Sequence, residues 1–162
     1  MNPDRWPFGI KPMTPARALL FGTITVGVLD ILDALLFFGF RGVAPIRIFQ
    51  SIASGLLGRA AFDGGLPTAM LGGLLHFFIA FAIVTVYYLA SQWLPRLSHH
   101  PLRYGLLYGL LVYGIMTWVV VPLSAAASGP PPPAVLVNGL LIHALGVGLP
   151  SALFARAARS TP

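Results

Sequence analysis

Four long apolar stretches dominate the sequence, at about residues 17–40, 67–90, 103–122 and 134–156. A helix needs about 20 predominantly apolar residues to cross the hydrocarbon core of a bilayer, and each stretch is long enough. Only 9% of the 162 residues are charged, whereas a soluble domain carries roughly 25%. We therefore expect an all-α membrane protein in which residues 1–162 form a single bundle of four transmembrane helices.

Prolines mark where several of these helices begin and end. Pro15, Pro67 and Pro101 stand at or just before three helix starts, where a missing N–H has little effect. Pro95 and Pro122 mark the ends of the second and third helices. The segment before the first apolar stretch is too long and too rich in proline for a signal peptide, and no small-residue cleavage site follows it. We expect the first apolar stretch to be retained as a helix.

The basic residues are distributed unequally between the two sides of such a bundle. The side of the termini carries Arg5, Lys11, Arg17, Arg96, Arg103, Arg156 and Arg159, and the other side carries Arg41, Arg47 and Arg59. The positive-inside rule therefore predicts a multi-pass protein with both termini in the cytoplasm. The net charge of +6 fits topology signals and anionic lipid head groups, so we expect the lipid bilayer as a partner and no nucleic acid.

The segment at about residues 45–62 has the pattern of an amphipathic helix. Its apolar positions recur at helical spacing (Ile46, Phe49, Ala53, Leu56, Leu57 and Ala60), opposite Arg47, Ser51, Ser54 and Gly58. The segment is too short to span a bilayer. Two interpretations stay open: a connecting helix on the outer interface, or a re-entrant lid. The lid would present Arg47, Gln50, Ser51, Ser54 and Arg59 to whatever lies beneath it.

Polar residues interrupt the apolar stretches at matching depths. Asp30, His76, Tyr113 and His143 each lie nine or ten residues from the outer end of their helix, which is ~13–15 Å at the rise of an α-helix. Asp33 and Asn138 lie about a turn nearer the outside. Small residues share the helix faces of these side chains, which favours close packing toward the bundle interior. They are Thr23, Gly27, Thr68, Gly72, Ala80, Gly105, Gly109, Thr117, Gly139 and Gly146.

We therefore predict a buried polar cluster of Asp30, Asp33, His76, Tyr113, His143 and Asn138. A charged carboxylate at this depth in a bilayer is energetically unfavourable, so each acid needs a partner or a proton. The cluster has four possible roles. It packs helices together through hydrogen bonds, it carries protons, it holds a metal ion such as iron, manganese or zinc through Asp30, Asp33, His76 and His143, or its two histidines ligate a haem.

The sequence gives little support to cofactor chemistry or catalysis. Cysteine is absent, which excludes disulfides, thiolate ligands and cysteine nucleophiles. No Glu-x-x-His pair supports a metal site, and small residues around His76 and His143 leave little room for a porphyrin. No nucleophile elbow, phosphate loop or zincin motif occurs, so no catalytic residue is assigned. We expect no cofactor, with a metal ion as the open alternative.

Three stretches carry a resemblance to known proteins: Gly42–Gly58, Leu75–Phe78 and Val137–His143. With them the chain resembles, over roughly residues 16–157, a recurring group of small bacterial four-helix membrane proteins. It is also loosely similar in size and layout to the YagU-like inner-membrane proteins. The resemblance implies the bacterial inner (cytoplasmic) membrane and four helices, and it carries over neither an activity nor a catalytic residue.

The leading hypothesis is an inner-membrane protein whose Asp/His cluster supports proton-linked transport or sensing of a small solute. The main alternative is a non-catalytic accessory subunit of a larger membrane complex, with the cluster as packing contacts. A membrane-embedded metal-dependent enzyme is the third. Because four helices enclose little space, we expect the bundle to pair with a second copy or to join a larger complex.

Overall fold

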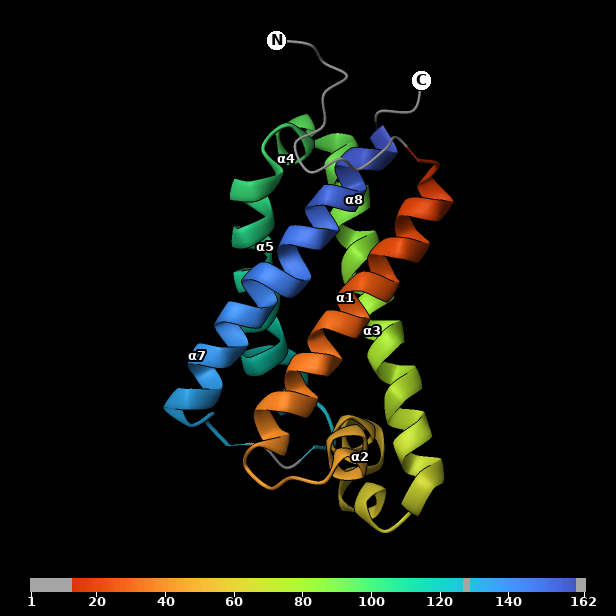
Figure 1. The fold of residues 1–162 in the computed structure, drawn as a ribbon, viewed down its shortest axis with the longest axis vertical. Helices are drawn as coiled ribbons and strands as arrows, with labels where there is room; N and C mark the ends of the chain where they lie inside the picture. The colour runs from red at the N-terminus through yellow and green to blue at the C-terminus, as the bar shows by residue number, and fades with distance from the viewer. Residues whose placement is uncertain (1–12, 127–128, 160–162) are drawn as a thin grey trace.

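The protein is a bundle of four long helical spans with a shorter helix across one end (Figure 1). A computed structural model describes residues 13–126 and 129–159. The spans are α1 (Pro15–Gly39), α3 (Gly65–Trp93), the continuous run Pro101–Leu123 and the continuous run Pro133–Arg159. All four are long and apolar enough to cross a membrane. The prediction of an all-helical chain with four membrane-length helices is confirmed, and no strand occurs in the described ranges.

The third and fourth spans each change helical type along their length. The third consists of α5 (Pro101–Ile115), the π-helical turn η2 (Met116–Val120) and α6 (Val121–Leu123). The fourth consists of α7 (Pro133–Ile142), the π-helical turn η3 (His143–Gly148) and α8 (Leu149–Arg159). A short helix that was not predicted, α4 (Pro95–His99), joins α3 to α5.

The prolines act at helix ends largely as predicted. α1 and α5 have Pro15 and Pro101 in their first turns, and α3 ends at Trp93, two residues before Pro95. Pro122 differs, because the third span continues past it to Leu123.

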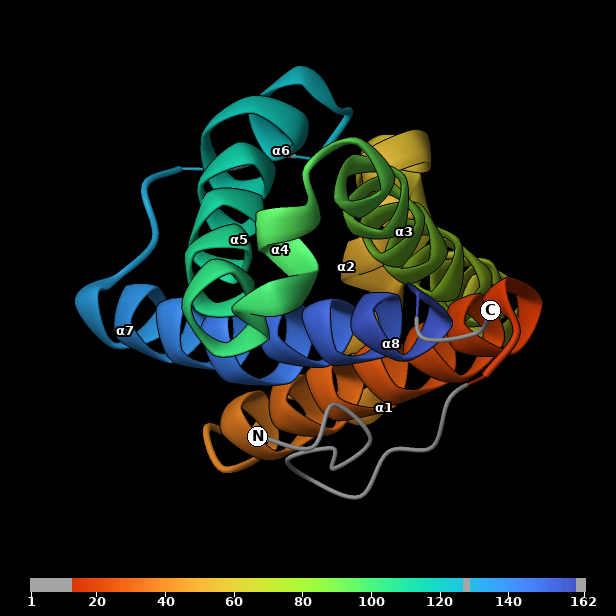
Figure 2. The same cartoon turned by 90° about the horizontal axis from the view of Figure 1, so that it is seen from above.

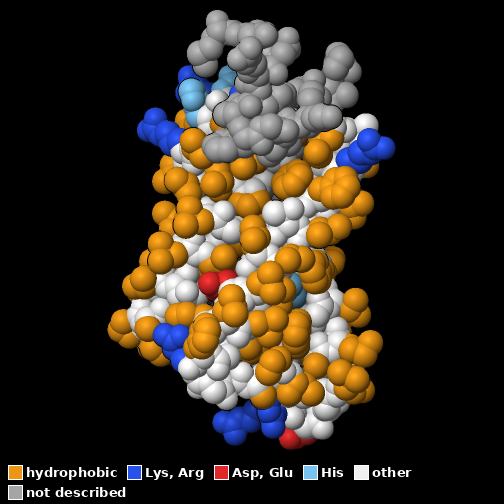
Figure 3. Space-filling view, viewed as in Figure 1, with side chains coloured by type: hydrophobic (Ala, Val, Ile, Leu, Met, Phe, Trp, Pro, Cys, Tyr) orange, Lys and Arg blue, Asp and Glu red, His pale blue; other side chains and the backbone are white. Residues whose placement is uncertain are grey.

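Successive spans run in opposite directions, so the bundle has two distinct ends. The start of α1, the helix α4 and the last turns of α8 lie at one end, and α2 lies at the other (Figure 1). Seen along the bundle, the α7–η3–α8 span lies beside α1, with α5 and α3 behind them (Figure 2). Large apolar side chains such as Leu36, Leu74 and Phe78 point outward and are more than half exposed. They cover the flank of the molecule with an apolar surface suited to lipid (Figure 3).

Glycines bring two pairs of helices into backbone contact. On α5, a Cβ at Gly109 would collide with the backbone carbonyl of His143, and a Cβ at Gly105 would lie 3.0 Å from the carbonyl oxygen of Gly148. On α3, a Cβ at Gly72 would collide with the carbonyl of Phe49 in α2. In lipid, where burial of apolar surface adds little, such close backbone packing is a main source of helix association.

A dry core seals the bundle on the side of the termini. Val26, Ala80, Val84, Val112 and Val147 come from all four spans and are nearly or fully buried against one another. Each lies on the terminal side of the predicted polar residue of its span. The space between this core and α2 is therefore the part of the bundle where a polar site has room.

The helix α2 (Pro45–Leu57), extended by the 3₁₀ turn η1 (Gly58–Phe62), is attached firmly to α3. Gln50 is buried, and its Nε2 donates to the carbonyl of Gly65 at 3.0 Å. Arg47 donates to the carbonyl of Phe62 at 2.8 Å. The predicted helix is therefore confirmed, and α2 and the start of α3 form one hairpin.

Replacing Gly72 by alanine is expected to push α2 away from α3. The added methyl group collides with backbone, which cannot rotate aside, so we expect a loss of about 1–3 kcal/mol of stability. The neighbouring Gly73→Ala is the matched control, because its Cβ would meet the Phe49 ring at an ordinary 3.8 Å. That control should gain up to ~1 kcal/mol from helix propensity. Thermal unfolding in detergent measures both, and equal effects would contradict the tight α2–α3 contact.

Candidate functional site

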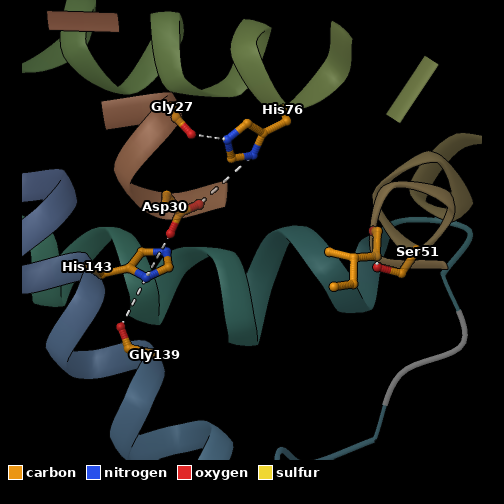
Figure 4. A network of polar contacts seen from close by, with 7 residues as sticks. Gly27, Asp30, Ser51, His76, Gly139 and His143 are labelled. Carbon is orange, nitrogen blue, oxygen red and sulfur yellow. Dashed lines mark hydrogen bonds and ion pairs between the residues drawn. The ribbon is translucent and has the colours of Figure 1, made fainter. Parts of the chain in front are cut away.

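A cavity of about 380 Å³ lies between the dry core and α2, and all four spans line it. The six predicted cluster residues all contribute to its wall: Asp30, Asp33, His76, Tyr113, Asn138 and His143. The rest of the wall is mainly apolar and includes Ile48 and Ile52 of α2, which the sequence pattern did not assign to the site. The structure thus brings the polar residues of four helices around one space, and Figure 4 shows three of them, Asp30, His76 and His143.

His76 on α3 is oriented by a backbone carbonyl of α1. Its Nε2 lies 2.8 Å from the carbonyl oxygen of Gly27. A carbonyl only accepts hydrogen bonds, so Nε2 must carry the hydrogen. In the neutral ring Nδ1 is then a bare acceptor, and it faces Oδ2 of Asp30 at 4.0 Å. Two acceptors face each other unless a proton resides on one of them.

His143 approaches the same carboxylate from the fourth span. Its Nδ1 lies 3.0 Å from the carbonyl oxygen of Gly139, one turn earlier, and 4.0 Å from Oδ1 of Asp30. The same reasoning puts the hydrogen on Nδ1. The ring of Tyr113 packs edge-on against this imidazole, with 5.0 Å between ring centroids. Asp30 therefore stands between two imidazoles, each held in place by a backbone carbonyl (Figure 4).

Asp30 and Tyr113 make no side-chain hydrogen bond to any described residue, and both border the cavity. Within the described residues, the Asp30 carboxylate forms no hydrogen bond, and its side chain is 29% exposed, lining the cavity. Tyr113 is 7% exposed, and its hydroxyl has no hydrogen-bond partner in the same part of the chain. Asp33 differs, because Nδ2 of Asn138 donates to its Oδ2 at 2.6 Å.

Two π-helical turns flank the site, and each has a proline just beyond it. The turn η2 contributes Met116 and Thr117 to the cavity, and η3 begins at His143. Pro122 and Pro150 lie two residues after these turns. A proline ring clashes with the carbonyl four residues earlier, and a wider turn relieves the clash. The two prolines inside apolar stretches are thus the signal that could have predicted these turns.

Of the five residues proposed for a lid, only Ser51 lines the cavity. Gln50 and Arg47 hold α2 to the α2–α3 connection, as described above. Ser54 is buried and donates to the carbonyl of Ser51 at 2.7 Å. Arg59 lies exposed in η1. The face of α2 toward the cavity is therefore mostly apolar, formed by Ile48, Ser51 and Ile52.

The predicted metal ligands are not grouped around one point in the described residues. Among residues 13–126 and 129–159, no group of three or more His, Cys, Asp or Glu side chains is placed to hold one. A ligating nitrogen must present a lone pair. Nδ1 of His143 carries its hydrogen toward Gly139, so in the neutral ring the lone pair is on Nε2. Nδ1 of His76 and the carboxylate of Asp30 face each other, and both have lone pairs.

Removing the amide of Asn138 tests the contact between α1 and α7. We expect Asn138→Ala to lower stability by about 1–2 kcal/mol, because the Asp33 carboxylate loses its donor. Asp33→Ala and the double variant complete a thermodynamic cycle, measured by unfolding in detergent. The coupling energy should be about 1 kcal/mol, the size found for hydrogen bonds between membrane helices. Strictly additive single effects would show that this hydrogen bond contributes nothing.

The fold and the cavity define the class of the molecule. Four membrane-length helices indicate a multi-pass membrane protein, and its bundle encloses a polar site closed on the side of the termini. No protein-family model, no curated protein and no solved structure matches the chain.

Proposed function

We propose that this protein binds a small solute in the cavity and links that binding to a proton held by Asp30 and His76, as a proton-linked carrier or sensor. One observation carries the proposal. The Asp30 carboxylate stands 4.0 Å from two imidazole nitrogens and makes no hydrogen bond in the described chain. A carboxylate without a hydrogen bond in an apolar bundle is better suited to exchanging protons or ligands than to holding helices together.

The distances argue against a purely structural cluster. Packing contacts between membrane helices depend on short hydrogen bonds near 3 Å. The two histidines make theirs to the backbone carbonyls of Gly27 and Gly139, which leaves Asp30 and Tyr113 without a hydrogen bond to any described residue. The accessory-subunit alternative is favoured by the paired Asp33–Asn138 contact at 2.6 Å. That pair lies at the α1–α7 side of the site, and we assign it the packing role.

We also propose which side of the membrane each end of the bundle faces. The distribution of basic residues supports cytoplasmic termini, which puts the dry core on the cytoplasmic side and α2 on the outside. The cavity then communicates with the outer side near Ser51, which is exposed and also lines the cavity. Leu56 and Leu57 of α2 are 64% and 43% exposed, and we propose that they dip into the outer lipid layer. We further propose the bacterial inner membrane as the location, and pairing with a second copy.

Proton binding is the property that tests this function without knowledge of the solute. We expect the wild-type protein in lipid nanodiscs to take up about one proton more than Asp30→Asn when the bath is acidified. Difference potentiometric titration in weak buffer measures this. Asp63→Asn, which changes an exposed acid after η1, is the control and should leave the Asp30-dependent uptake unchanged. If the wild type and Asp30→Asn took up equal amounts, the site would hold no exchangeable proton and the proposal would fail.

A further inference from the structure

We infer that the ligand of the cavity is a small organic cation, an ammonium group on an apolar body. This inference rests on the proposed function and names the chemical class of its solute. The ammonium group occupies the space beside Asp30, and the apolar body lies toward α2.

The charge of the cavity wall selects this class. Asp30 and Asp33 lie one turn apart on α1 and both line the cavity. No lysine or arginine belongs to the described lining. The other titratable groups facing Asp30 are His76 on α3, His143 on η3 and Tyr113 on α5. An anion would meet two carboxylates here without a compensating cation, whereas an ammonium group supplies the missing charge.

The remainder of the wall suits an apolar body. Toward α2 the cavity is lined by Ile48, Ile52, Phe37, Phe38 and Val121. Aromatic faces also attract cations, and Phe37 already has the guanidinium of Arg41 stacked 3.6 Å from its ring centroid. Arg41 itself is exposed and lies outside the cavity lining.

Tyr113 provides an independent indication of a ligand. Its side chain is more than nine-tenths buried, it lines the cavity, and its hydroxyl finds no partner among the described residues. The fully buried hydroxyls without a partner in the described chain are those of Thr23, Thr85 and Ser98, so the Tyr113 hydroxyl is open to the cavity and free to bind a ligand. It is satisfied when the cavity holds a molecule that donates or accepts a hydrogen bond, as a protonated amine or its bound water does.

Cation binding and proton binding compete for one carboxylate. The facing atoms of Asp30 and His76 are both acceptors, so a proton on either of them joins the two groups in the empty cavity. An ammonium group beside Asp30 replaces that proton as the counter-charge, so the proton leaves to solvent. The exchange keeps the net charge of the site constant, and it couples the two species in opposite directions.

The route into the cavity also suits an amphiphile. A shallow apolar groove between α1 and α7 is lined by Phe37, Val137, Asn138 and Leu141 among others, and it shares Phe37 and Asn138 with the cavity. Figure 3 shows acidic atoms at the surface within this apolar flank. A cation with an apolar body can partition into the lipid interface and reach the carboxylates from there.

Three probes with the same body and different charge test the inference. Phenylbutylamine, phenylbutanol and phenylbutanoate are titrated into the protein in nanodiscs, and calorimetry measures their affinities. A pH indicator in weak buffer measures proton release, and empty nanodiscs serve as the blank. We expect the amine to bind at least about tenfold more tightly than the alcohol, as charge-assisted contacts allow, and to release a proton. Asp30→Asn should remove this preference, and Asp30→Glu and the distant Asp63→Asn should retain it.

The outcomes separate the ligand class from the proposed function. Tighter or equal binding of the alcohol or the carboxylate, no binding of any probe, or an amine preference that survives Asp30→Asn in a normally folded variant, would each overturn the cation inference. The Asp30-dependent proton uptake in the titration would still stand in those cases. Loss of that uptake would instead remove the proposed function, whichever probe binds.

Discussion

Replacing Asp30 by asparagine is expected to abolish proton-coupled ligand binding while leaving the bundle folded. Asparagine fills nearly the same volume but cannot accept a proton or balance a cation. Because the carboxylate makes no hydrogen bond in the described residues, its removal should change stability by less than about 1 kcal/mol. Proton release on addition of phenylbutylamine and thermal unfolding in detergent are measured on the same preparation.

Asp30→Glu and Asp63→Asn are the controls for this prediction. The first retains a carboxylate and should retain proton release, with altered affinity because of the longer side chain. The second removes an acid outside the cavity and should change neither property. If Asp30→Asn instead lowered stability by about 2 kcal/mol or more and kept proton release, the carboxylate would be a packing group.

The largest effect on stability is expected from Gly109→Ala. The new methyl group collides with the backbone carbonyl of His143, so α5 and the fourth span must separate along their contact. We expect a loss of about 3 kcal/mol or failure to fold, at the upper end for overpacking because the obstacle is backbone. Displacement of His143 should also weaken its contact with Asp30. Unfolding in detergent measures the first effect, and the amine titration measures the second.

Gly114→Ala on the same helix is the matched control. Its Cβ would lie 3.6 Å from the ring of Trp118, which is an ordinary contact. The gain in helix propensity should therefore stabilise the protein by up to ~1 kcal/mol. Similar destabilisation of both variants would mean that glycine flexibility, rather than close approach of α5 to η3, accounts for the effect.

The number and ends of the spans could be predicted because lipid imposes a simple requirement on sequence. A helix that crosses a bilayer satisfies its backbone internally and must be apolar over about 20 residues. Short helices cannot be predicted from this requirement. The helix α4 has only five residues, too few for a periodic pattern.

The packing of α2 could not be predicted from its apolar pattern. The structure buries Gln50 and Ser54 and exposes Leu56 and Leu57. In lipid the outside is as apolar as the inside, so hydrophobic periodicity does not tell which face of a helix meets protein.

The residues that line the site could be predicted from their depth along each helix, but their hydrogen-bond partners could not. Counting residues from the helix ends predicted that polar groups of four helices lie level, and the six residues line one cavity. The partners of the histidines could not be predicted, because His76 and His143 form hydrogen bonds with backbone carbonyls, which every residue carries. Pro122 was interpreted as a helix end, so the π-helical turn before it was not foreseen.

In the proposed function the cavity holds water or solute, whereas a structural cluster would leave it a dry packing contact. The chain contains no cysteine, so a single introduced cysteine reports on one position. Thr117 lines the cavity, and Leu74 lies 71% exposed on the outer face of α3. Each is changed to cysteine, and the protein in nanodiscs is treated with a charged, membrane-impermeant thiosulfonate. We expect rapid modification of Thr117→Cys and protection of Leu74→Cys by lipid. A Thr117→Cys protein that reacts only after denaturation would show that the cavity is dry.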